Sequence, residues 1–426
     1  MAPVAGRRYA RDAGATTAIV TDAGGTTFDV SLVRDGTIPW TRETWIGPVY
    51  QGHMTGFPSV DVKSIGAGGG SIARVDDGGM LHVGPASAGS TPGPACYGRG
   101  GLRPTMTDAA LVLGYIDPDF FLGGRMKLAV DAAVAVIETK VARPLGLSVD
   151  DAALAIIDLG TESMVNAIEE ITVKQGIDPE DTVIIGGGGA AGLNGVAIAR
   201  RLRCRTVVFP DTGAALSAAG AIMSELRAEA AHTEFMRTTN FDCERANRIL
   251  ADLKQKAQAG SAAKADHAVT STIDYAIEGR YRSQVWEIEV ALRGGLLAGP
   301  SDVRRLVEDF HARHVELFGF ADDDDEIEIV AWRAVCRTQV AHSADVGRIR
   351  TMPRIGALRR RSMAFRETGR VAAASYDLDN LDPGEPVIGP AIVESSFTTI
   401  VVHPGARAQR MANGGFVVNV RPSPDR

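Results

Sequence analysis

The chain contains 426 residues, and its 45 Lys and Arg residues against 52 Asp and Glu residues give a net charge of −7. At roughly 100–200 residues per domain, this length predicts two to three domains. A hydrophobic share of 45% and a charged share of 23% disfavour a disordered, fibrous or coiled-coil protein. The acidic balance argues against nucleic-acid binding, because contacts to phosphate need a basic surface.

Membrane insertion and disulfide bonding are also disfavoured. The longest apolar-looking stretch, residues 151–175, contains several acidic residues, whereas a membrane span needs about 20 nearly uncharged residues. The cysteines are scattered without a CxxC pair, at Cys96, Cys204, Cys243 and Cys336. This spacing disfavours a zinc module and a disulfide framework. The first residues have too few apolar side chains for a signal peptide, so we expect a cytoplasmic protein.

Two β-hairpins are predicted in the first hundred residues. In each, β-type apolar runs flank a turn rich in glycine, at residues 17–36 and 72–85. The pattern then becomes helical, with a cap expected at residues 107–108. A long helix is expected over residues 148–174, opened by Ser and Asp residues that can cap it.

A strand, a glycine loop, a helix and a second strand are predicted next, at residues 181–185, 186–192, 193–202 and 206–210. A further helix is predicted at residues 217–230.

The glycine-rich pattern stops near Thr238, and we predict a domain boundary there. Residues 1–235 then form the first domain and residues 240–426 a separate α+β domain. In the second domain we expect helices at residues 243–264 and 302–317, together with several strands.

The turn of the first hairpin has the residue types of a phosphate and magnesium site. Small residues leave backbone N–H groups bare, threonine hydroxyls can donate hydrogen bonds, and a carboxylate can hold Mg²⁺ directly or through its waters. The residues are Asp22, Gly24, Gly25, Thr26, Thr27 and Asp29, with Asp22 as the candidate magnesium ligand. The alternative is a plain hairpin, for which two adjacent glycines are a sufficient explanation.

The second glycine loop, residues 186–189, lies between a strand and a helix, where a ligand can lie over bare backbone. Close packing of helix on strand is the alternative. The Rossmann spacing and a GxxxxGK[ST] sequence are both absent from the sequence, which disfavours a dinucleotide site or a P-loop. The combination of the D-x-G-G-T-x-x-D hairpin with this loop resembles the ATP-binding superfamily of actin, sugar kinases and heat-shock chaperones. In that superfamily, hairpins hold phosphates and a glycine loop holds adenosine.

Several longer phrases lie between and beyond the two loops. They are SIGAGGGSIA (64–73), HVGPASAG (82–89), PGPACYG (92–98), GGLRPTMTDA (100–109), FLGG (121–124), GRYRSQ (279–284) and GPAIVE (389–394), followed by Thr398-Thr399 and Pro404-Gly405. Together they resemble the A-type subunit of the hydantoinase/oxoprolinase family over nearly the whole chain. The resemblance implies an α/β fold: an actin-like ATPase lobe lacking its first half, followed by an α+β C-terminal domain.

Two departures from the family pattern matter. Full-length members begin with another such hairpin and a first lobe, whereas this chain opens near the family's mid-chain S-G-P-A phrase, at residues 2–6. Half of the ATP cleft is therefore expected to come from another polypeptide, unless the chain is a truncated product. A histidine that the family often has after the second glycine loop is absent from residues 188–194, so its role is not transferred.

The resemblance also implies cofactors, chemistry and partners. We expect ATP and Mg²⁺, with nucleotide contacts from the hairpin residues and from Gly68, Gly69, Gly70, Gly187, Gly188, Gly189 and Ala190. A second transition metal in the assembly is left open. Relatives transfer the γ-phosphoryl group to an amide or enolate oxygen. We expect activation of a cyclic amide (a hydantoin, 5-oxoproline or a lactam) for hydrolysis, with partners that include a B-type subunit and a small-molecule substrate. The alternatives are an acetone- or acetophenone-type ketone carboxylase and a non-catalytic ATP-binding scaffold.

Three further residues are weak candidates for chemistry. His82, Cys96 and Asp108 could together form a metal site, and Cys96 could be a nucleophile. The alternative for His82 is a polar position on a hairpin, and for Cys96 a small buried side chain without a paired histidine.

Overall fold

The computed structural model describes residues 1–420 except 42, 48–50, 57–58, 263–267 and 341–358. The chain forms two compact units. Unit 1 comprises Met1–Met223 and Asp345–Arg426, and unit 2 comprises Ser224–Ala344. The units therefore divide the chain differently from the predicted bounds of 1–235 and 240–426, because the last strands belong to unit 1.

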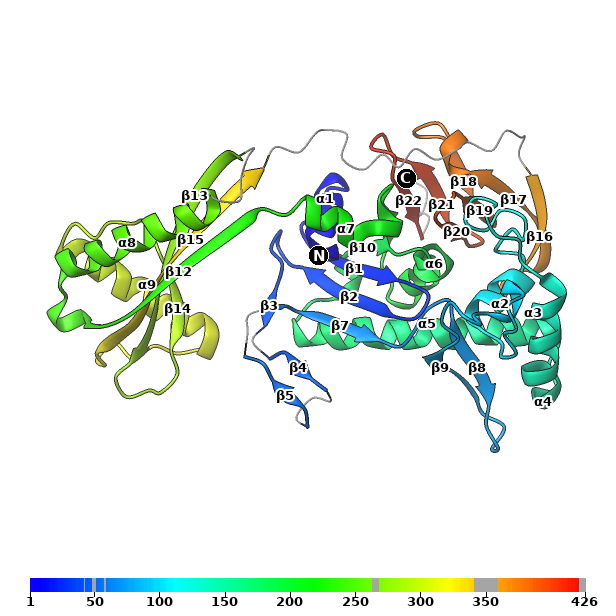
Figure 1. Ribbon diagram of the computed structural model, residues 1–426, viewed down its shortest axis with the longest axis horizontal. Coiled ribbons are helices and arrows are strands. Elements are labelled where there is room, and N and C mark those ends of the chain that lie inside the picture. Colours follow the sequence, from blue (N-terminus) through cyan, green and yellow to red (C-terminus); the bar gives the residue numbers. More distant parts are fainter. Residues whose placement is uncertain (42, 48–50, 57–58, 263–267, 341–358, 421–426) are drawn as a thin grey trace. The chain divides into compact units, whose positions relative to one another are not determined.

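Unit 1 is built on an eight-stranded sheet with the order β18-β21-β22-β11-β10-β1-β2-β7 (Figure 1). Strands β10 and β11 run parallel to β1, and β2 runs antiparallel to it. The strands are β1 (Ala18–Ala23), β2 (Phe28–Val33), β7 (Val62–Ile65), β10 (Val183–Gly187), β11 (Thr206–Phe209), β18 (Pro386–Ile388), β21 (Arg407–Arg410) and β22 (Phe416–Asn419). The predicted first hairpin, β1–β2, is confirmed, as is the predicted strand, glycine loop, helix and strand, in which the helix is α6 (Ala191–Arg201).

The two faces of this sheet pack against different helices. Side chains alternate between the faces of a strand, so Val20 packs with α1 (Ala2–Asp12) and α7 (Leu216–Ile222). Its neighbour Ile19 packs on the opposite face, in the core that includes α6 and α5 (Val149–Lys174). The predicted long helix is α5, and its N-cap is Ser148, whose hydroxyl accepts a hydrogen bond from the Asp151 N–H.

The segment between β7 and α5 carries the second hairpin. It contains β8 (Ser71–Val75), β9 (Leu81–Ser87), α2 (Met106–Val112), α3 (Val130–Ile137) and α4 (Arg143–Leu145). The hairpin β8–β9 is confirmed, but the helix cap differs from the prediction. Thr105 is the N-cap of α2, and Asp108 completes a capping box from the third helical position.

The remaining strands of unit 1 form smaller sheets. A four-stranded sheet contains β16 (Arg359–Phe365), β17 (Gly369–Asp377), β19 (Ala391–Glu394) and β20 (Thr399–Val402). Two short pairs are β3 (Trp40–Thr41) with β6 (Ser59–Val60), and β4 (Trp45–Ile46) with β5 (His53–Met54).

Unit 2 is a four-stranded antiparallel sheet with two helices. The strands are β12 (Leu226–Arg237), β13 (Ala268–Tyr281), β14 (Ile288–Leu292) and β15 (Ile327–Val340), and the helices are α8 (Cys243–Ala262) and α9 (Pro300–Phe318). Both helices contribute to one buried cluster with the sheet, centred on large side chains such as Trp332 and Phe310.

The predicted helix over residues 217–230 is wrong in its second half. Helix α7 ends at Ile222, and Leu226 begins strand β12, which pairs with β15 along most of its length. This ladder of backbone hydrogen bonds outweighs the helix propensity of the local residues, because propensity is a weak preference that tertiary context overrides.

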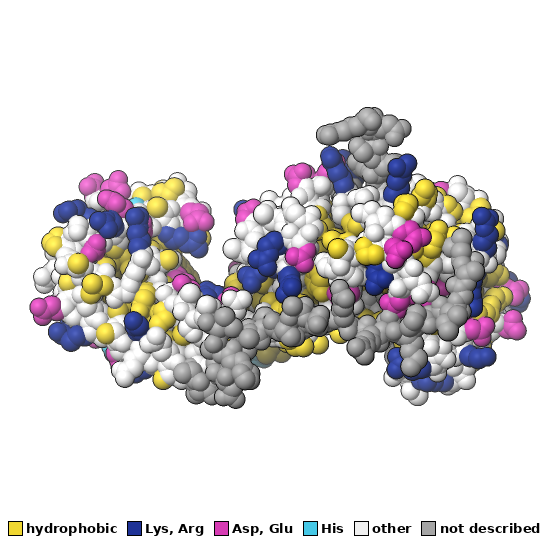
Figure 2. Space-filling model, turned by 90° about the horizontal axis from the view of Figure 1, so that it is seen from above, with side chains coloured by type: hydrophobic (Ala, Val, Ile, Leu, Met, Phe, Trp, Pro, Cys, Tyr) yellow, Lys and Arg dark blue, Asp and Glu magenta, His cyan; other side chains and the backbone are white. Residues whose placement is uncertain are grey.

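Acidic and basic side chains are interspersed on the visible face of each unit (Figure 2). Among the described residues, no helix is both long and apolar enough to cross a membrane.

Candidate functional site

Three glycine-rich segments that are far apart in sequence meet at the carboxyl end of β1. The Gly69 N–H donates a hydrogen bond to the Gly24 carbonyl oxygen at 3.1 Å, and the Ala190 N–H donates to the Ala23 carbonyl oxygen at 3.0 Å. The register of the parallel pair β1–β10 places Asp22 beside Gly187. The hairpin turn, the 66–70 loop and the loop after β10 therefore form one continuous backbone surface.

The glycines of these segments do two different things. A Cβ atom on Gly68 would lie 2.6 Å from the Gly24 carbonyl oxygen, and one on Gly188 would lie 2.2 Å from that of Ala23, so these positions require glycine for close packing. Gly25 is different, because a Cβ atom there would meet nothing within 4 Å and the residue is exposed. The tip of the hairpin is thus open to a ligand.

Two carboxylates face each other just behind this tip. Asp22 and Asp29 are directly opposite in the β1–β2 pair, and the Ser217 hydroxyl donates to Asp22 Oδ2 at 2.9 Å. Burial raises the pKa of Asp22, the hydrogen bond from Ser217 opposes this rise, and the charge of Asp29 adds to it. Two carboxylates and a hydroxyl on one face suit Mg²⁺, which uses few protein ligands and keeps several waters.

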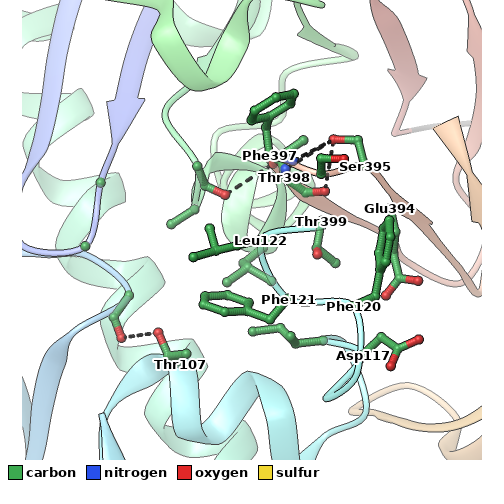
Figure 3. A pocket seen from close by; sticks show the side chains of 18 of the residues that line it. Thr107, Asp117, Phe120, Phe121, Leu122, Glu394, Ser395, Phe397, Thr398 and Thr399 are labelled. Carbon is green, nitrogen blue, oxygen red and sulfur yellow. Dashed lines mark hydrogen bonds between the residues drawn. The ribbon is translucent and has the colours of Figure 1, made fainter. Parts of the chain in front are cut away.

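A pocket of about 190 Å³ lies on the other side of the glycine loops (Figure 3). Its lining combines backbone, aromatic, hydroxyl and acidic groups. The lining residues are Gly24, Gly25, Gly69, Gly189 and Ala190 from the loops; Tyr97, Ile116, Phe120, Phe121, Leu122, Leu193 and Phe397; Thr107, Ser395, Ser396, Thr398 and Thr399; and Asp117 and Glu394. All of them belong to unit 1.

Two loops give the pocket its walls. The loop between β19 and β20 is fastened to the second glycine loop, since the Thr398 hydroxyl donates to the Gly189 carbonyl oxygen at 3.2 Å. The other wall is the loop between α2 and α3. It includes Phe121, whose ring centroid is 5.8 Å from that of Tyr97. The next residue, Leu122, has a φ of 53°, in the left-handed region that is costly for a bulky side chain.

One end of the pocket is acidic. Glu394 is buried, and accepts hydrogen bonds from Arg361 Nη2 at 2.7 Å and from the Ser375 hydroxyl at 3.0 Å. Asp117 Oδ2 lies 3.5 Å from Arg361 Nη1. Arg361 thus contacts both acids, and compensates part of the cost of burying their charge.

The family follows from the sequence comparison. A hydantoinase/oxoprolinase family model matches residues 1–230, and a model of the hydantoinase/oxoprolinase C-terminal domain matches residues 237–411. The chain belongs to the hydantoinase/oxoprolinase family.

Two relatives of this chain are named as enzyme subunits. The caprolactamase subunit alpha of Pseudomonas jessenii is 34% identical over 414 residues, which are 95% of this chain and 58% of that protein. The acetophenone carboxylase gamma subunit of Aromatoleum aromaticum is 31% identical over 451 residues, covering 99% of this chain and 59% of that protein. The chain therefore spans less than two thirds of the length of these relatives.

Solved structures share the mixed α/β fold with its large sheet. The crystal structure of the ATP-dependent caprolactamase from Pseudomonas jessenii has a TM-score of 0.76 at 33% identity, and covers 98% of this chain and 61% of its own. The nucleotide-free structure of acetone carboxylase has a TM-score of 0.81 at 24% identity, with coverage of 98% and 60%. The second likeness shows the shared fold alone.

Within this family member, the residues singled out from sequence fall into three groups. Those that line the pocket are Gly24, Gly25, Gly69, Gly189 and Ala190. Those at the hairpin outside the pocket are Asp22, Thr26, Thr27 and Asp29. Those packed closely against neighbouring atoms are Gly68, Gly70, Gly187 and Gly188. Their contacts with nucleotide stay a prediction, and the third group has a structural reason to be glycine.

The weak candidates have local hydrogen-bond partners. Asp108 is buried, and its carboxylate accepts hydrogen bonds from the N–H groups of Ala95, Cys96 and Thr105. Burial raises the pKa of the Cys96 thiol far above its usual range, so the nucleophilic thiolate is disfavoured. His82 Nε2 lies 2.6 Å from Asp76 Oδ2. The described residues contain no group of three or more His, Cys, Asp or Glu side chains that could hold a metal ion.

Several lining residues were missed as site residues from sequence. Tyr97, Phe121 and Leu122 lie within phrases that resemble the family, as do Glu394, Thr398 and Thr399. The convergence of these phrases on one pocket is the signal that could have identified them. Asp117, Phe120 and Phe397 lie outside the phrases, and only the tertiary structure brings them to the site.

Proposed function

We propose that this chain carries one side of the nucleotide site of an ATP-dependent enzyme that activates a cyclic amide (a hydantoin, 5-oxoproline or a lactam) for hydrolysis. One observation carries the proposal: the hairpin turn and the strand–glycine-loop–helix unit line the same pocket. The order of an antiparallel hairpin followed by two strands parallel to β1 supports an actin-like ATPase lobe.

The geometry suggests how the parts of ATP are divided. The pocket volume of about 190 Å³ is below the roughly 300–1,000 Å³ of drug-sized sites, so it suits a base rather than a whole nucleotide. The base would lie beside Gly189 and Ala190, and the phosphates at the exposed hairpin tip, where Gly25 and Thr26 offer backbone N–H groups. Asp22 and Asp29, which lie just behind this tip, would hold Mg²⁺ directly or through its waters.

The chemistry follows from phosphoryl transfer. With ATP and Mg²⁺ bound, the γ-phosphoryl group would pass to the amide oxygen, releasing ADP and leaving an imidate phosphate that water can attack. The residues of this chain would contribute positioning and charge compensation, which supply most of the catalysis in such reactions.

We propose that the other side of the cleft comes from polypeptide outside this chain, and that a B-type subunit completes the enzyme. Positioning requires contacts around the γ-phosphate from both sides. The chain alone is therefore expected to turn over ATP far more slowly than the assembly, as a phosphate-release assay on both samples would show. Equal turnover by the two samples would overturn the split-site proposal.

A ketone carboxylase is the second candidate function. The observation that favours it is the 31% identity with the acetophenone carboxylase gamma subunit over 99% of this chain. The deciding experiment measures ADP release and product formation by the reconstituted assembly with hydantoins, 5-oxoproline, a lactam, and aryl ketones plus bicarbonate. Stimulation by cyclic amides supports the first function, and stimulation only by ketone with bicarbonate supports the second. No stimulation by any of these substrates would favour a non-catalytic scaffold.

A further inference from the structure

The two ends of the pocket differ in chemistry. Figure 3 shows Thr107 on one side and Asp117 with Glu394 on the opposite side, with Phe121 and Leu122 between them. The Thr107 side adjoins the glycine loops, because the Thr107 hydroxyl donates to the Gly69 carbonyl oxygen at 2.8 Å. A ligand that spans the pocket would have backbone at one end and carboxylates at the other.

The middle of the pocket suits a planar ring. Tyr97, Phe120, Phe121 and Phe397 line it, and aromatic side chains favour stacked or edge contacts with a flat ring system. A purine base, with its ribose toward the glycine loops, would direct its six-membered ring toward the acidic end.

The acidic end accepts hydrogen bonds. Asp117 and Glu394 are the charged residues among the described lining, whereas Arg361, which contacts both, does not line the pocket. Ionised carboxylates are acceptors only, with about four lone-pair sites each, so they can accept from a ligand as well as from protein donors. The side chain of Glu394 is only 5% exposed, so an approaching acceptor would meet a poorly hydrated negative charge.

We propose that Asp117 and Glu394 select adenine by accepting hydrogen bonds from its exocyclic amine. This inference rests on the proposed function, in which the pocket holds the base of ATP. Adenine offers an amine at position 6, whereas hypoxanthine and guanine place a carbonyl oxygen there, and that oxygen would be repelled by the carboxylates. Discrimination of this kind is strong where a buried polar group is left unpaired by the wrong ligand.

The test compares ATP with ITP, which differ at position 6 of the base. Dissociation constants are measured by calorimetry on the reconstituted assembly, for the wild type, Asp117→Asn and a matched control, Asp119→Asn. Asp119 is two residues away, and its side chain is 71% exposed. Asparagine at position 117 keeps an oxygen that can accept the Asp119 N–H, which donates to Asp117 Oδ1 at 2.9 Å, so this variant is expected to fold.

The wild type and the control are expected to prefer ATP by tenfold or more, and Asp117→Asn to reduce this preference at least threefold, because a carboxamide can donate to a carbonyl. Glu394→Gln provides a second variant with the same expectation. Equal binding of ATP and ITP by the wild type would overturn this inference alone, as would an unchanged preference in both variants. Failure of the wild-type assembly to bind any purine nucleotide would instead overturn the proposed function, and this inference with it.

Discussion

Two glycine-to-alanine substitutions near the hairpin tip can separate the effect of an added methyl group on ligand binding from its effect on folding. Gly25→Ala places its Cβ atom where nothing lies within 4 Å, so its free energy of unfolding is expected to stay within about 0.5 kcal/mol of wild type. In Gly68→Ala the Cβ atom would lie 2.6 Å from the Gly24 carbonyl oxygen and 2.9 Å from the Thr26 nitrogen. Overpacking of this kind costs about 1–3 kcal/mol.

Gly25→Ala is expected to weaken ATP binding, even though it leaves the free energy of unfolding nearly unchanged. The added methyl group of Gly25→Ala blocks the approach of a phosphate to the bare backbone, although the fold is unchanged. Loss of one hydrogen bond to a charged group costs about 1.5–3 kcal/mol, which raises the dissociation constant roughly ten- to hundredfold. Gly294→Ala is the matched control, because that exposed glycine in unit 2 also has nothing within 4 Å of an added Cβ atom.

Calorimetric titration of the assembly with ATP and Mg²⁺ measures the effect on ATP binding, and thermal unfolding measures the effect on stability. Each kcal/mol of destabilisation should lower the melting temperature by about 2–4 °C for a domain of this size class. Wild-type ATP affinity in Gly25→Ala would refute the assignment of the hairpin tip to phosphate. Wild-type stability in Gly68→Ala would refute the packing explanation for that glycine.

Three further predictions concern carboxylates. Asp22→Asn should raise the Mg²⁺ concentration needed for half-maximal ATP binding by about tenfold, because it removes a charge from the cation's ligands. Nearby His403 holds the pKa of Glu367 at about 2, below its usual 4.5. The stabilisation that this low pKa reflects is present above pH 4.5 and is lost as the pH falls toward 2. Between pH 4.5 and 2, the free energy of unfolding of Glu367→Gln should therefore fall less with decreasing pH than that of the wild type. Asp108→Asn should lower the free energy of unfolding by at least about 2 kcal/mol in urea, because a carboxamide cannot accept all the hydrogen bonds from Thr105 and its neighbours.

Each of these predictions has an outcome that contradicts it. An unchanged Mg²⁺ requirement in the first variant would remove Asp22 from the cation site. Parallel acid-unfolding curves for the wild type and the second variant would show that the carboxylate at position 367 is not stabilised in the folded state. For the third, urea midpoints within experimental error of each other would show that the buried carboxylate is dispensable.

The hairpins and the glycine loops could be predicted from sequence because their signals are local. Alternating apolar residues around a Gly-Gly turn specify β1–β2, and the strand, glycine loop and helix around β10 are equally short-range patterns. Ser148 identified the start of α5 for the same reason, since a cap acts within one helical turn. Short-range patterns are therefore sufficient to single out Gly24, Gly25 and Gly189 as candidate residues.

Long-range pairing decided the rest. The antiparallel pairing of β22 with β11 joins the end of the chain to unit 1, and the pairing of β12 with β15 turns a helix-prone segment into a strand. The acidic end of the pocket arises in the same way, because Asp117 and Glu394 meet only when β19 is placed beside the loop after α2. No local pattern encodes such contacts, since their free energy comes from ladders and burial between segments that are distant along the chain.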